Sequence, residues 1–124
     1  MIEQKLPKSL SCLLSQDKQT GLWINYCLDF DLVTSGKSED EVWNSMKAML
    51  KAHVESCFAD GFSEGLSHQA KIEAWVAFAQ QFLLGSFRQE TIKFDLKRND
   101  STLSGLWLKG VEVESLPNRF QTAA

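Results

Sequence analysis

The period of the hydrophobic pattern changes at Gly36. Before this glycine, two short apolar runs, residues 9–15 and 22–30, alternate in part and are separated by the polar stretch 16–21, a pattern typical of a β-hairpin. A third short strand is expected at 32–34. After the glycine, apolar residues recur at helical spacing. The chain therefore opens as an antiparallel sheet followed by a helix, which restricts it to folds of the mixed α/β (α+β) class.

A helix start follows Gly36 directly. Ser38 and Glu41 have the spacing of a capping box, in which the Ser38 hydroxyl accepts from the Glu41 amide and the Glu41 carboxylate accepts from the Ser38 amide. Acidic residues in the first turn complement the helix dipole. One apolar stripe is expected to lie on the sheet, and Gly61 is expected to end the helix. The stripe consists of Val42, Met46, Met49, Leu50, His53 and Cys57.

The second half of the chain predicts one more helix and two more strands. The helix is expected over 67–84, capped by Ser67. Residues 90–98 alternate cleanly and predict a half-exposed antiparallel strand. Residues 103–113 are apolar but carry Gly105 and Gly110, which fits a bent strand or an irregular packed segment, and we expect the strand. The expected order is β-β-β-α-α-β-β, a small, mainly antiparallel sheet packed by helices. The apolar side of the second helix is expected to hold Ile72, Trp75, Val76, Ala79, Phe82 and Leu83.

One domain accommodates the whole chain. Its 124 residues are 44% hydrophobic and 23% charged, a composition typical of globular domains. No stretch rich in proline, glycine or serine marks an internal boundary. We therefore expect a single domain over residues 1–116 and a flexible tail over 117–124.

The net charge of −3 at pH 7 bears on the choice of partner. Phosphate binding normally needs lysines and arginines gathered on one face, so we expect a basic protein as partner and no nucleic acid. No apolar run has the length of a signal peptide core or of a membrane-spanning helix. We therefore expect a cytoplasmic protein without a membrane partner.

The cysteines are interpreted as structural. Cys12, Cys27 and Cys57 are far apart and have neither a CxxC pair nor zinc-finger spacing. A catalytic thiol would need a positioned histidine, for which His53 and His68 are the candidates. His53 is expected to pack on the sheet, since it lies on the apolar stripe. We therefore expect no catalytic residue, no metal ion and no cofactor.

Three segments in fixed order resemble the HicB-type antitoxin domain of toxin–antitoxin systems. They are Tyr26-Cys27-Leu28-Asp29, Thr34-Ser35-Gly36 and Ser38-Glu39-Asp40-Glu41-Val42. The resemblance spans about residues 10–61. It implies a degenerate RNase-H-like βββαβ fold without nuclease activity, usually dimeric, that covers the active surface of a small basic RNA-cleaving toxin. Residues 90–98 would supply the last strand of that fold.

The chain departs from the HicB pattern in two places and lacks a common appendage. Val42 and Trp43 replace the small alanines usual in the family, and 64–85 add a helical segment that the minimal domain lacks. Full antitoxins of this type often carry a DNA-binding motif at the carboxy terminus, and residues 102–124 show no such pattern. We therefore expect no DNA binding by this chain alone.

The leading hypothesis is a non-catalytic module that sequesters a small basic protein and itself forms a homo-oligomer. It would use an exposed strand edge and the rim of the first helix. Trp43 is expected beside the apolar stripe, at the edge of that helix. The expected partner-binding residues are Asp29, Asp31, Glu39, Asp40 and Trp43.

Two alternatives belong to other functional classes. A residual nuclease would use Asp29, Asp31 and Asp95 with magnesium, since phosphodiester cleavage by metals needs converging carboxylates. A structural homo-oligomer would use residues 72–84, the apolar part of the second helix, as a dimer seam.

Overall fold

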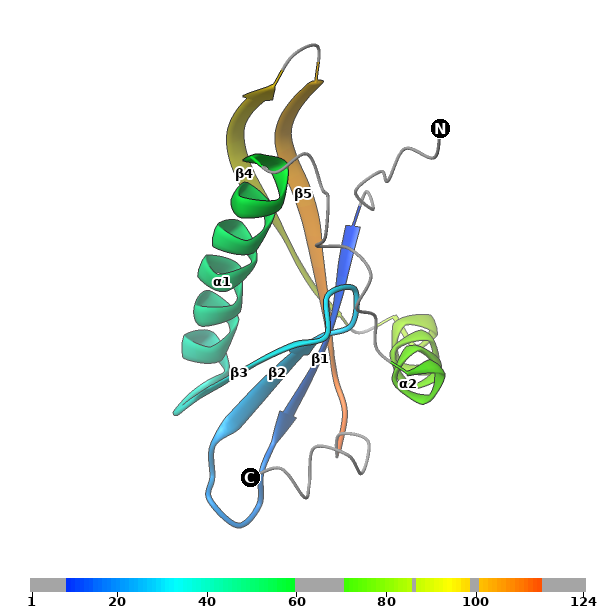
Figure 1. Cartoon of the computed structure of the whole chain (residues 1–124). Coiled ribbons are helices and arrows are strands. Elements are labelled where there is room, and N and C mark those ends of the chain that lie inside the picture. The colour runs from blue at the N-terminus through cyan, green and yellow to red at the C-terminus, as the bar shows by residue number, and fades with distance from the viewer. Residues whose placement is uncertain (1–8, 60–70, 86, 99–100, 115–124) are drawn as a thin grey trace.

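The elements follow one another in the order predicted from the sequence. The computed structural model describes residues 9–59, 71–85, 87–98 and 101–114 (Figure 1). The expectations for Gly61, Ser67, His68 and the tail 117–124 lie outside these residues. The elements are β1 (Ser9–Gln16), β2 (Trp23–Cys27), β3 (Leu32–Gly36), α1 (Glu39–Ala59), α2 (Ile72–Leu83), β4 (Arg88–Arg98) and β5 (Ser101–Glu112).

The strands form one sheet in the order β3-β2-β1-β5-β4. Neighbouring strands are antiparallel except β1 and β5, which run parallel from Ser9 opposite Trp107 to Leu14 opposite Glu112. The register of β4 against β5 shifts between Lys93 and Leu96. The prediction of a mainly antiparallel sheet is confirmed, and the glycine-containing segment expected at 103–113 is a long inner strand.

The two helices cover opposite faces of the sheet (Figure 1). Alternation along β2 separates the two cores: Cys27 packs with α1, whereas Tyr26 and Leu28 pack with α2. Both faces of this strand are therefore covered. None of the helices in the described part of the chain is both long enough and apolar enough to span a membrane.

Helix α1 forms the larger core. Its first turn is capped as predicted, since the Glu41 amide donates to the Ser38 Oγ at 3.1 Å. The Glu41 carboxylate accepts from the Lys37 amide at 3.1 Å, one residue before the amide that the capping box predicted. Met49, expected on the buried stripe, is 38% exposed. The buried side of α1 holds Val42, Trp43, Met46, Leu50, Val54, Cys57 and Phe58.

Helix α2 buries a different side from the one predicted. Ala74 and Phe78 point into the core, and Trp75, Ala77 and Phe82 pack at its margin. Ile72 and Leu83, expected to be buried, are 73% and 84% exposed. The prediction was wrong because α2 is apolar on nearly every side, so hydrophobic periodicity alone does not decide which side faces the sheet.

Candidate functional site

The acidic residues expected to form one cluster lie in two pairs. Asp29 and Asp31 lie in the turn between β2 and β3, and Glu39 and Asp40 open α1. Strand β3 runs between the two pairs. Its five residues span about 16 Å at the usual rise of a strand. The structure therefore places carboxylates at both ends of β3 rather than in one patch.

The pair in the β2–β3 turn is anchored to the sheet. Asp29 Oδ1 accepts from the Ser11 amide of β1 at 2.7 Å. Burial raises the pKa of Asp29 to about 6, against the opposing effect of the backbone amides that donate to it. Asp31 adopts a positive φ of 55° and accepts from the Tyr26 hydroxyl. Both carboxylates therefore fix the turn as well as giving it charge.

The pair at the start of α1 is partly engaged by β4. The exposed carboxylate of Asp40 accepts from the Arg88 guanidinium at 2.8 Å. Arg88 also lies 3.5 Å from Glu90, which in turn pairs with Lys47 at 2.5 Å. The hydrogen bond from Lys47 is the main cause of the lowered pKa of Glu90. These ion pairs tie the first turns of α1 to the strand at the far edge of the sheet.

Trp43 does not lie on the surface. The expectation that it sits at the helix edge was wrong: its side chain is fully buried, with the Arg88 guanidinium 4.8 Å above its ring. Gly110 of β5 makes this possible, because a Cβ there would lie 2.5 Å from Trp43 Cζ3. The indole fills the space that the absent side chain leaves. In this structure Trp43 is a core residue and is not available to a partner.

The carboxylates of the nuclease hypothesis are not brought together. Asp29 and Asp31 follow β2, whereas Asp95 belongs to β4, and β1 and β5 lie between these strands. Among the described residues, no three histidine, cysteine, aspartate or glutamate side chains are grouped so that they could hold a metal ion.

The structure also pairs a thiol with a histidine that the sequence analysis did not connect. His53 Nε2 lies 3.6 Å from Cys57 Sγ, and the His53 ring packs against Phe30 with centroids 4.7 Å apart. The i, i+4 spacing on one helix was the signal that could have found this pair. Cys57 is only 8% exposed, so a substrate has little access to its sulfur.

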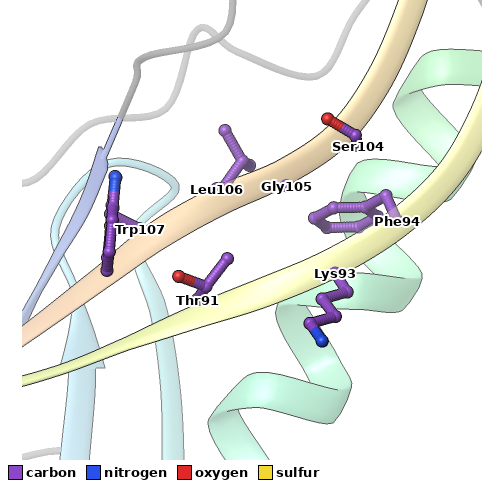
Figure 2. A pocket seen from close by; sticks show the side chains of 7 residues that line it. All are labelled: Thr91, Lys93, Phe94, Ser104, Gly105, Leu106 and Trp107. Carbon is purple, nitrogen blue, oxygen red and sulfur yellow. The ribbon is translucent and has the colours of Figure 1, made fainter.

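A shallow hollow lies on the β4–β5 ribbon (Figure 2). Its volume is about 410 Å³, and Lys93 is the charged residue among those that line it. Trp107, Thr91 and Lys93 are on the face away from α1, since Leu106 and Leu108 belong to the core beneath that helix. Trp107 is 48% exposed. The residues that line the hollow include no histidine, cysteine, aspartate or glutamate.

Within the described part of the chain, the outer edge of β3 presents backbone groups that pair with no other strand. The amides of Leu28 and Asp17 donate to the carbonyls of Ser11 and Leu22, so alternate β2 residues from 22 to 28 bond to β1. The backbone groups of residues 23, 25 and 27 therefore point the other way and form hydrogen bonds with residues 36, 34 and 32 of β3. The amides and carbonyls of Val33 and Ser35 therefore point to the open edge.

The three segments that resemble a HicB domain lie at the ends of β2 and β3 and at the start of α1. Tyr26 to Asp29 close β2 and enter the turn, Thr34 to Gly36 end β3, and Ser38 caps α1. Residues 90–98, expected as the family's last strand, lie in β4 at the sheet edge, and β5 is the strand beside β1. Comparisons with models of protein families, with curated proteins and with solved structures find no match to this chain. The HicB resemblance therefore stays a prediction.

Proposed function

We propose that this protein is a non-catalytic binding module, similar to a HicB-type antitoxin, that sequesters a small basic protein such as an RNA-cleaving toxin. The observation that supports the proposal is the open edge of β3 with acidic residues at both ends. A strand of the partner would add to this edge through main-chain hydrogen bonds. Basic side chains at its two ends would meet Asp29 or Asp31 and Glu39 or Asp40.

The two edges of the sheet differ in how they are protected. Strand β4, at the far edge, carries Lys93, Lys97 and a register irregularity, features that discourage pairing with another chain. Strand β3 has the sequence LVTSG, with no charged residue. Within the described residues its outer side pairs with no other strand. An unprotected edge is costly to keep unless it serves for binding, so β3 is the better candidate of the two.

The proposal is tested by blocking the edge without disturbing the sheet. Ser35→Pro removes an outward amide, and proline is tolerated where an edge residue directs its N–H to solvent. Ser35→Ala keeps the amide and is the matched control. Tagged wild-type and variant proteins would be used to capture partners from a lysate of the native host. Circular dichroism and thermal unfolding would verify that both variants fold.

The expected result is a small basic protein retained in fixed ratio by the wild type and by Ser35→Ala, and at least about tenfold less by Ser35→Pro. The double variant Asp31→Asn, Glu39→Gln should weaken capture at low salt and make it less sensitive to added salt, because the removed charges are those that salt screens. Equal retention by Ser35→Pro, or the absence of any stoichiometric basic protein, would contradict the proposal.

A further inference from the structure

Helix α2 is apolar on two opposite sides, and the sheet covers only one of them. Three of its twelve residues are polar: Glu73, Gln80 and Gln81. The side formed by Ala74 and Phe78 is buried against β1 and β5. A helix that is apolar all round is normally buried all round. The outer side of α2 is therefore a surface that needs a partner.

The outer side forms a regular seam. Ile72, Val76, Ala79 and Leu83 are all exposed, and their spacing of four, three and four residues is that of the a and d positions of a coiled coil. No charged residue interrupts the seam. Leu84 and Phe87, also exposed, extend the apolar surface beyond the end of the helix.

The spacing of the seam is the same when it is read in either direction. If a second copy of α2 packs antiparallel, Ile72 meets the partner copy's Leu83 and Val76 meets the partner copy's Ala79, and both contacts occur twice by symmetry. Reversal also places Glu73 beside Gln80 of the other copy, on one flank. A parallel pair would instead place each seam residue against its own copy, with Ala79 against Ala79 and Leu83 against Leu83. The antiparallel pair sets each small residue against a larger one, so shape favours it.

We infer that the protein forms a homodimer through an antiparallel pair of α2 helices, with Ile72, Val76, Ala79 and Leu83 as the seam. This inference goes beyond the proposed function and does not depend on it, since β3 is on another part of the sheet. Two helices of this length touch over about 18 Å. Because such an interface is small, we expect a dissociation constant on the order of 10 μM.

Sedimentation equilibrium of the whole chain between about 1 and 200 μM tests the dimer. Leu83→Gln should weaken association at least about tenfold, because each copy loses a buried leucine. Ile72→Gln, at the other end of the seam, should act in the same way. Both residues are exposed in the monomer, so the variants should fold. Met49→Gln, at a similarly apolar but less exposed position on α1, is the control and should leave association unchanged.

The orientation is tested by mixing two single variants, Ile72→Cys and Leu83→Cys, under mild oxidation. An antiparallel pair predicts that the mixture gives a disulfide between residue 72 of one copy and residue 83 of the other, identified by mass spectrometry of peptides, in preference to links between identical positions. A protein that stays monomeric at 200 μM, an association insensitive to both glutamine variants, or links only between identical positions would overturn the inference. Partner capture through β3 can still succeed or fail independently.

Discussion

The two faces of the sheet differ in how completely the chain covers them. On one face α1 contributes seven buried residues over about six turns, and its exposed side is polar apart from Met49 and three alanines. On the other face α2 contributes two buried residues and leaves an apolar side in solvent. A helix with one apolar stripe needs one neighbour, whereas a helix with two needs two. The apolar side of α1 is therefore buried within the fold, whereas one apolar side of α2 is left exposed.

The largest expected effect comes from removing the anchor of the closed face. Trp43→Ala should lower the free energy of unfolding by about 3–5 kcal/mol, because it leaves a cavity over Gly110 that α1 cannot collapse into. Phe78→Ala on the α2 face should cost about 2–3 kcal/mol, because that core is smaller and more open. Urea unfolding measures both. An equal or larger loss for Phe78→Ala would break the comparison.

The carboxyl that ties the β2–β3 turn to β1 gives stability a pH dependence. The pKa of Asp29 is about 6 in the folded protein and about 3.9 in an unfolded chain. Since the folded state holds the proton more tightly, this residue favours folding fully below pH 4 and loses that contribution as the pH rises through 6, by up to about 2–3 kcal/mol. Asp29→Asn keeps an oxygen for the Ser11 amide and should remove this dependence. Unfolding between pH 4 and 8 measures it, and identical pH profiles for both proteins would contradict the assignment.

A buried amide weakens the face that α1 covers. Asn25 is fully buried, and among the described residues neither its Oδ1 nor its Nδ2 has a hydrogen-bond partner. Desolvation without a compensating bond is unfavourable, so Asn25→Leu, which keeps the branched shape of the side chain, should raise the free energy of unfolding by about 1–2 kcal/mol. Asn25→Asp is the contrasting variant and should be strongly destabilising at neutral pH. A loss of stability in Asn25→Leu would show that the amide is bonded in solution.

The smallest expected effect is a difference in reactivity between the thiols inside the α1 core and the thiol at its rim. Cys12 and Cys27 are completely buried, and burial raises the pKa of Cys12 well above its ordinary value. Cys57 lies at the rim beside His53. In a native-state reaction with a disulfide reagent, Cys57 should therefore react first, and the other two thiols should react only on unfolding. Cys57→Ser should abolish the early phase; a remaining early phase would place the accessible thiol elsewhere.

The sequence predicted elements whose signals are local. Alternation located the strands, and Ser38 with Glu41 located the start of α1, because both signals depend on residues a few positions apart. The burial of Trp43 could not be predicted in this way, since it depends on Gly110, which only the pairing of β5 with β1 brings beneath the indole. The expectation that the acidic residues lie in one cluster was wrong for a similar reason. The length of β3 separates Asp31 from Glu39, although the two are close in sequence.

The position of β5 has a consequence for how the chain is made. Among the described strands β5 is the last along the chain, but it lies inside the sheet, between β1 and β4. Until residues 101–112 leave the ribosome, one edge of β1 has no neighbour, and β1 is buried along most of its length in the finished fold. An apolar strand with an open edge is a template for aggregation. We therefore expect premature termination before residue 101 to give an aggregated product rather than a smaller folded domain.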